Sequence, residues 1–121
     1  MLSLHLERVD GYVIIECRGR IVRSESAFTL RNAVMSQADA RTIVLDLSEV
    51  QAVEAGGLGM LSFLVRWAHE HDVRLKIFNP VQAVYQKLVR AHLTSECELA
   101  TPSEMQALWS RRRSTGMPKA A

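Results

Sequence analysis

Aromatic residues, cysteines, prolines and net charge are all scarce in this 121-residue chain. Aromatic side chains make up 6% of it, and a hydrophobic content of 48% built on Val, Leu, Ile and Ala suits the core of one compact α/β domain. The net charge of +2, without a basic stripe interleaved with aromatics, argues against a nucleic-acid partner. No apolar run approaches the roughly 18 residues of a membrane span, so we expect a chain that does not cross a membrane.

The cysteine usage and the first residues predict where the protein resides. Cys17 and Cys97 have neither a pair spacing nor a secretory context, so we expect two reduced thiols in the core. The first ten residues carry acids among the apolar side chains and lack the layout of a signal peptide. Together these features predict a cytoplasmic protein.

The apolar pattern predicts an α/β fold around a mixed β-sheet. Alternation in residues 2–7 predicts a first strand at a sheet edge, and residues 12–18 predict a second strand. The turn signal Asp10-Gly11 between them predicts an antiparallel hairpin. Within residues 42–47, Ile43, Val44 and Leu45 run without polar alternation, which predicts a central strand that is covered on both faces.

The remaining elements are predicted to be helices that alternate with short strands. The first helix is predicted to be capped by Ser24 or Ser26, with one face formed by Ala27, Leu30, Val34 and Ala38. A second helix over residues 58–71 and a strand over residues 74–78 follow. The third helix is predicted to start at Pro80, with one face formed by Val81, Val84, Leu88 and Ala91. After an extended piece over residues 97–100, Thr101 is predicted to cap the last helix, with Glu104 at capping-box spacing and a packed face formed by Met105, Leu108 and Trp109. This order predicts an antiparallel N-terminal hairpin, a parallel sheet centre and about four packed helices. We expect a single domain over residues 3–112 and a disordered tail over residues 113–121.

The segment that precedes the second helix is the most informative part of the sequence. It reads S-E-V-Q-A-V-E-A-G-G-L-G over residues 48–59 and is predicted to be a loop. Glycines and an acid gather here at the start of a helix, yet no Ser, Thr, Tyr, Cys or His occurs between Glu49 and Gly59. A loop that is shaped like a reactive site but holds no nucleophile indicates binding rather than chemistry.

Two patterns near this loop resemble catalytic or nucleotide-binding motifs, but both are incomplete. Gly57, Gly59 and Ser62 nearly match G-x-G-x-x-G, but the third glycine is absent and no acid follows about 20 residues later, as a dinucleotide site requires. No G-x-S-x-G nucleophile elbow is present either. We therefore expect neither a nucleotide cofactor nor a hydrolase triad.

Histidines and carboxylates likewise lack a functional spacing. His69 and His71 are two residues apart, so on a helix they point away from each other, unlike the i, i+4 pair that binds zinc. Asp46 lies at a strand end and is interpreted as structural, rather than as the partner of Glu54 in a catalytic carboxylate pair. We expect no enzyme activity and no metal site.

The second helix has an unusually wide apolar surface. At about 100° per residue, Leu58, Leu61, Leu64, Val65 and Ala68 mark its core face. Met60, Phe63 and Trp67 lie beside that face and widen the apolar arc to roughly 220°, well beyond the roughly 100° that packing on one sheet requires. Either neighbouring helices cover the excess, or these three side chains are partly exposed and form an apolar docking ridge.

The segment I-V-L-D-L-S-E-V-Q-A-V-E-A-G-G-L-G-M-L resembles the signature of STAS domains of the anti-sigma-factor antagonist type, in which a strand ending in Asp-Leu-Ser leads to a D-S-S-G-L-G loop. The resemblance covers residues 3–112 and includes the initial hairpin, the R-L-K-I-F strand and the Pro-Val helix start. Glu54 takes the place of the family's Asp, Ala55 that of its first Ser and Gly56 that of its second Ser. Gly57, Leu58 and Gly59 match Gly-Leu-Gly. The second Ser is the residue that the family's partner kinase phosphorylates, so Gly56 would lack that switch.

The resemblance implies a non-enzymatic interaction module that binds a serine-kinase-like anti-sigma factor. The partner-binding residues would be Glu54, Ala55, Gly56, Gly57, Leu58, Gly59, Met60, Phe63 and Trp67, and Ser48 or Ser62 are the remaining candidates for phosphorylation near the loop. The alternatives are an accessory subunit that packs on the ATPase of a lipid or anion transporter, and a nucleotide-sensing STAS domain. We expect a monomer or a weak dimer.

Overall fold

The computed structural model describes residues 2–22 and 25–116, with side chains described up to residue 111. Its elements, in chain order, are strands β1 (Leu2–Val9) and β2 (Tyr12–Ile21), helix α1 (Glu25–Met35), strand β3 (Thr42–Val53), helix α2 (Ala55–Glu70), strand β4 (Arg74–Phe78), helix α3 (Gln82–Arg90), the 3-10 turn η1 (Leu93–Ser95), strand β5 (Glu98–Leu99) and helix α4 (Pro102–Gly116). None of the described helices is long and apolar enough to cross a membrane.

The five strands form one mixed sheet in the order β1-β2-β3-β4-β5. β1 and β2 pair antiparallel across the Asp10-Gly11 turn, where Asp10 adopts a left-handed φ of 55°. All the other neighbouring strands pair parallel. The predicted fold class, with an antiparallel hairpin at one side and a parallel centre, is therefore confirmed, and β1 lies at the sheet edge as expected.

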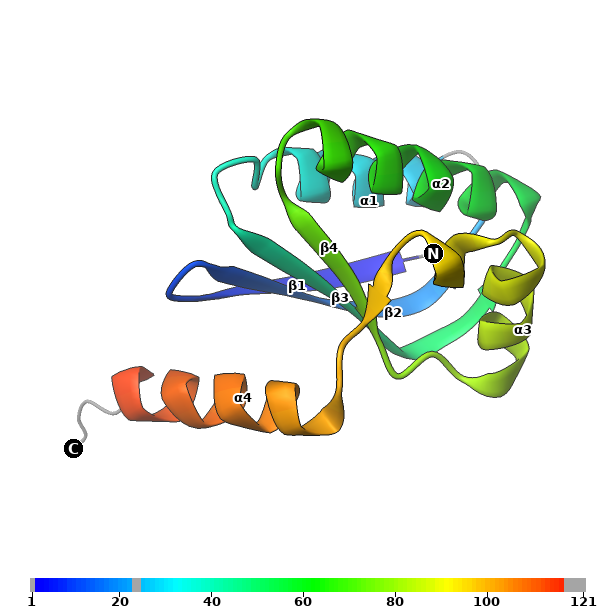
Figure 1. Cartoon of the computed structure of the whole chain (residues 1–121). Coiled ribbons are helices and arrows are strands. Elements are labelled where there is room, and N and C mark those ends of the chain that lie inside the picture. Colours follow the sequence, from blue (N-terminus) through cyan, green and yellow to red (C-terminus); the bar gives the residue numbers. More distant parts are fainter. Residues whose placement is uncertain (1, 23–24, 117–121) are drawn as a thin grey trace.

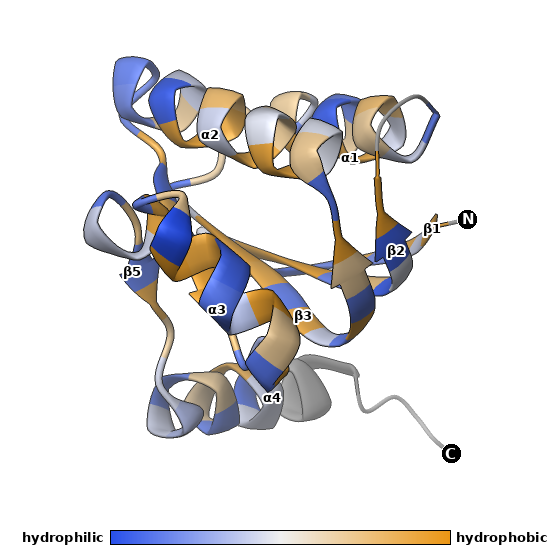
Figure 2. Ribbon diagram, turned by 90° about the vertical axis from the view of Figure 1, so that its right-hand side faces the viewer, coloured by the Kyte–Doolittle hydropathy of each residue, from blue (hydrophilic) through white to orange (hydrophobic). Residues whose placement is uncertain are grey.

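Helices cover both faces of the sheet and create two cores. α1 and α2 lie side by side on one face, α4 lies on the opposite face, and α3 lies at the end of β3 (Figures 1 and 2). The larger core joins the sheet to α1, α2 and α3, and its fully buried members include Ile15, Leu30, Leu45 and Leu64. A smaller core under α4 contains Val9, Ile14, Val44, Ala100, Met105 and Leu108. This two-sided burial explains why residues 43–45 run without polar alternation.

The predicted loop over residues 48–59 is wrong. β3 continues to Val53, and only Glu54 separates it from α2. Two register shifts in the pairing with β2 allow the strand to continue, and they bring Gly19 opposite Val50 and Ile21 opposite Val53. Val50 and Val53 are fully buried, so packing on the sheet overrides the polar residues Ser48, Glu49 and Gln51 of this segment. α2 accordingly begins at Ala55, three residues before the predicted start.

Several predicted helix ends also differ from the structure. Ser26 lies inside α1, where its hydroxyl accepts a hydrogen bond from Val22 N (3.2 Å) and donates one to Val22 O (3.0 Å), while Ser24 lies outside the described residues. α1 ends at Met35, so Ala38 is exposed rather than part of the helix face. α3 begins at Gln82 after the extended residue Val81, and Pro80 precedes the helix instead of opening it.

Helix α4 starts as predicted but ends later. Glu104 N donates to the Thr101 hydroxyl at 3.1 Å, which is the expected cap. The carboxylate of Glu104 does not complete a capping box; instead it accepts a hydrogen bond from Lys76 Nζ at 2.6 Å. α4 continues to Gly116, so the predicted tail is helical at its start, and residues 117–121 lie outside the described residues.

Both cysteines are free thiols. Burial raises the pKa of Cys17 to about 12, with smaller contributions from Asp46 and Glu16. Burial also raises the pKa of Cys97 to about 11, helped by Glu98 and Glu96. Because the thiolate is the reactive form, both side chains are poor nucleophiles near neutral pH. Cys17 is buried in the larger core as predicted, whereas Cys97 is only half-buried against it.

The pair formed by Lys76 and Glu104 should stabilise the attachment of α4 to the sheet. Both side chains are largely buried (13% and 21% exposed), so Glu104→Ala should lower the free energy of unfolding by about 1–3 kcal/mol because it leaves a partly buried ammonium. Urea denaturation measures this change. The double replacement Lys76→Met with Glu104→Leu should recover much of the loss, and a single-variant effect below about 0.5 kcal/mol would contradict the role assigned to the pair.

Candidate functional site

The junction of β3 and α2 exposes a helix N-terminus that no side chain caps. Glu54 has extended backbone angles (φ −113°, ψ 179°), and its side chain makes no capping hydrogen bond. Its carboxylate instead lies 3.6 Å from Arg20 Nη2, and both side chains are about half exposed. The first N–H groups of a helix have no intrahelical acceptor, so the first turn of α2 presents unsatisfied donors and the positive end of the helix dipole.

Gly57 allows this first turn to lie against the end of β2. Ile21 O accepts a hydrogen bond from Glu54 N at 3.1 Å, which ties the junction to β2. A Cβ atom on Gly57 would lie 2.1 Å from Ile21 O and 2.8 Å from Ile21 C. Both are backbone atoms that cannot rotate away, so any larger residue must move the helix or the strand. The sequence showed a cluster of glycines here, but it could not indicate which of them the packing requires.

The structure brings most of the predicted binding residues to one surface. Glu54, Ala55, Gly56 and Gly59 are exposed, Leu58 and Met60 are half-buried against the larger core, and Phe63 is 38% exposed. Positions 56, 60 and 63 have i, i+4, i+7 spacing, so they lie along one face of α2. We call Gly56, Gly59, Met60 and Phe63 the α2 stripe.

Trp67 does not belong to this surface. It is only 6% exposed, is part of the larger core and stacks on His71 with ring centroids 4.7 Å apart. The prediction that Trp67 is partly exposed is therefore wrong, and for this residue the covering of α2 by its neighbours is the correct alternative. The apolar ridge reduces to Phe63 with the half-buried Met60.

Two features on the helices beside α2 were not predicted from the sequence. On the neighbouring helix α1, Phe28 and Met35 are 51% and 36% exposed, and Arg31 lies 5.0 Å from the ring centre of Phe28. On the other side of α2, a shallow hollow of about 350 Å³ is lined by Ala55, Leu58, Lys87, Arg90 and Ala91. α3 contains no acidic residue, and this feature of the sequence could have indicated a positively charged surface here.

The side chains considered for chemistry have structural roles. The Ser48 hydroxyl donates to Asp46 Oδ1 at 2.6 Å, and Ser48 N donates to the same oxygen at 3.0 Å. Asp46 therefore interacts with Ser48, whereas Glu54 interacts with Arg20. His71 Nδ1 lies 2.8 Å from Trp67 O. In the part of the chain that the structure describes, no group of three potential metal ligands occurs.

The glycine requirement can be tested with two matched alanine variants. Gly57→Ala should lower the free energy of unfolding by several kcal/mol because the new methyl group meets the backbone of β2. Gly59→Ala should instead raise it by about 0.5–1 kcal/mol, because a Cβ atom added there would have no neighbour within 4 Å and alanine favours the helix. Thermal and urea denaturation compare the two. Equal effects of the two substitutions would contradict the close approach at Gly57.

Comparisons with known proteins agree on the family. The sequence model of the STAS domain matches residues 3–104 of the chain. Similar solved structures include a putative anti-sigma factor antagonist from Thermotoga maritima (TM-score 0.74, 20% identity, 88% of this chain and 94% of that one) and one from Mycobacterium paratuberculosis (TM-score 0.73, 18% identity, 90% and 95%).

The anti-sigma factor antagonist SpoIIAA in its unphosphorylated form is also similar, with a TM-score of 0.71 and 18% identity over 97% of this chain and 100% of that one. No curated protein matches the sequence significantly. At these identities the structures establish the fold, and the family match extends over most of the chain. The chain belongs to the STAS domain family.

Proposed function

We propose that this chain is a non-enzymatic antagonist that binds a serine-kinase-type anti-sigma factor through the first turn of α2 and the α2 stripe. The observation that carries the proposal is the exposed, uncapped start of α2 in a STAS domain, with an exposed phenylalanine on the same helix face. The proteins of similar structure described as anti-sigma factor antagonists support this choice of partner.

The described geometry suits a protein partner better than a small molecule. The α2 stripe is a convex helix face with Phe63 as its apolar anchor, and Phe28 is a further exposed aromatic residue on the neighbouring helix α1. The hollow beside Ala55 and Leu58 is shallow and open. Buried aromatic anchors surrounded by polar groups are typical of protein interfaces, whereas ligand sites are deep and enclosed.

The second part of the proposal is that phosphorylation does not reverse this binding. SpoIIAA has been solved in a phosphorylated and an unphosphorylated form. In this chain the position that we align with the family's acceptor serine is Gly56, and Ala55 precedes it. A phosphate would add about two negative charges in the middle of the docking surface and oppose binding. Without a hydroxyl at residues 54–59, the chain would remain competent to bind.

Neither nearby serine replaces that switch in the folded state. The Ser48 hydroxyl is part-buried and occupied by Asp46. Ser62 is half-buried on α2 and lies away from the first turn of the helix. A kinase that reached either hydroxyl would have to disturb β3 or the body of α2.

The docking surface can be tested by capture from the native cell extract followed by calorimetry with the purified partner. Wild type should retain an ATP-binding anti-sigma factor, and Phe63→Asp should weaken the measured affinity at least about 100-fold because it places a charge in the apolar anchor. Leu99→Asp is the control, since Leu99 is also an exposed apolar residue (44%) but lies on β5. Equal affinities of wild type and Phe63→Asp, or retention of a transporter ATPase instead, would refute this assignment.

The missing switch can be tested by intact mass after incubation with the captured kinase and ATP. Wild type should gain no phosphate, whereas Gly56→Ser should gain one and then lose its affinity for the partner. Peptide mapping locates any phosphate that does form. A stoichiometric phosphate on Ser48 or Ser62 of the wild type that lowers binding would show that the switch has moved rather than disappeared.

A further inference from the structure

Within the described residues, no other strand pairs with the outer edge of β1. It is eight residues long and pairs with β2 in continuous register, from Leu2 opposite Gly19 to Val9 opposite Tyr12. The strand at the opposite edge, β5, has only two residues and therefore offers few backbone groups for pairing. Proteins usually protect a long edge strand with a bulge, a proline or an outward lysine, and β1 contains none of these.

The hairpin turn determines which backbone groups face this edge. Val9 and Tyr12 flank the two-residue turn and form the first hydrogen-bonded pair, so odd-numbered residues of β1 bond to β2 and even-numbered residues point outward. Leu4 and Leu6 therefore direct their N–H and C=O groups away from the sheet. Within the described residues, these groups make no hydrogen bond with any other segment.

The side chains along β1 complement a second copy of the same strand. If two β1 strands meet antiparallel about Leu6, each His5 lies opposite a Glu7 of the other copy, and the two Leu6 side chains lie opposite each other. Within one chain, His5 Nε2 and Glu7 Oε2 are already 3.9 Å apart. Leu6 is 38% exposed on the face that carries α1, so this pairing would cover an apolar side chain in both copies.

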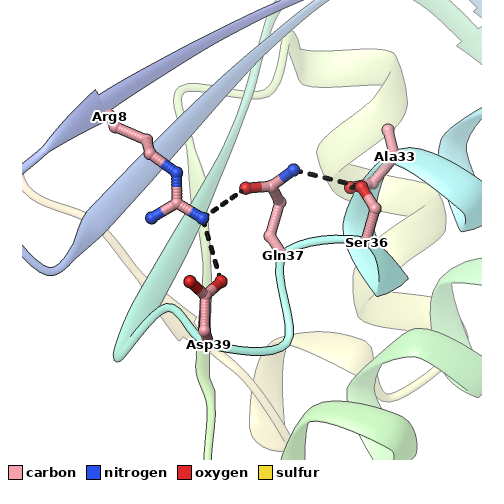
Figure 3. A network of polar contacts seen from close by, with 5 residues as sticks. All are labelled: Arg8, Ala33, Ser36, Gln37 and Asp39. Carbon is pink, nitrogen blue, oxygen red and sulfur yellow. Dashed lines mark hydrogen bonds and ion pairs between the residues drawn. The ribbon is translucent and has the colours of Figure 1, made fainter.

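Side-chain hydrogen bonds fix the position of the C-terminal half of β1. Arg8 Nη2 donates to Gln37 Oε1 and Asp39 Oδ1, both at 2.9 Å, and Gln37 in turn donates to the Ser36 hydroxyl at 3.1 Å (Figure 3). The hydrogen bond and charge of Arg8 lower the pKa of Asp39. These contacts tie the edge strand to the segment after α1, so less conformational entropy is lost when a partner strand adds.

We propose that a second copy of this chain adds antiparallel to β1, centred on Leu6, and extends the sheet across a two-fold axis. Such an interface is isologous, so each copy uses the same strand. Eight residues at about 3.4 Å each form an edge about 27 Å long. Pairing two single strand edges of this length buries less than the roughly 800 Å² per partner of a standard stable interface. The dimer is therefore weak and reversible, with a dissociation constant on the order of 10 µM to 1 mM.

The first test is sedimentation of wild type, Leu6→Lys and Leu99→Lys over a concentration series up to about 1 mM. The wild type and the Leu99→Lys control should shift together from monomer to dimer. Leu6→Lys should weaken association at least about tenfold, because two ammonium groups would face each other across the axis. A wild type that stays monomeric throughout, or a dimer that Leu6→Lys leaves unchanged, would overturn the proposal.

The second test uses wild type alone and does not depend on a variant folding. Amide exchange followed by NMR should show that the Leu4 and Leu6 amides become at least about fivefold slower as the dimer forms. The His5 and Glu7 amides, which bond to β2, should change little. Dimerisation with fast exchange at Leu4 and Leu6 would place the interface elsewhere and exclude β1 pairing.

Discussion

The close approach of α2 to the end of β2 is the contact on which the rest of the site depends. Gly57 brings the first helical turn against the backbone of Ile21, and Ile21 O also accepts the hydrogen bond from Glu54 N. Lys87 Nζ donates to Val53 O at 2.9 Å from the other side. Because the end of β3 is held between β2 and α3, the helix can begin after a single residue, and its free N–H groups are presented on a fixed surface.

The fold was largely predictable because the burial of a strand or helix face determines the spacing of apolar residues along the sequence. The hairpin, the two-sided centre and the cap at Thr101 follow from periodicity and turn chemistry, and the structure confirms them. The continuation of β3 to Val53 was not predictable, because it depends on two register shifts against β2. Glu49 and Gln51 are exposed, so this half of the strand reads locally as a loop.

The site was only partly predictable for a related reason. The apolar arc of α2 was visible, but the sequence could not show that Trp67 is buried and Phe63 exposed, since that depends on what packs beside α2. The cations Lys87 and Arg90 on α3 join the start of α2 only through the tertiary structure. A site whose residues come from separate helices has no single motif in the sequence.

The proposed dimer would place the docking surfaces apart from its interface, because β1 lies at one edge of the sheet and α2 follows β3 at its centre.

The central claim is that the first turn of α2 binds the partner protein. Its most direct test is the amide exchange of the complete chain with and without its captured partner. The account predicts that the amides of Ala55 and Gly56, which are exposed and lack intrahelical acceptors, exchange fast in the free chain and slow strongly on binding. Unchanged exchange there, with protection confined to α4 or β5, would contradict the account.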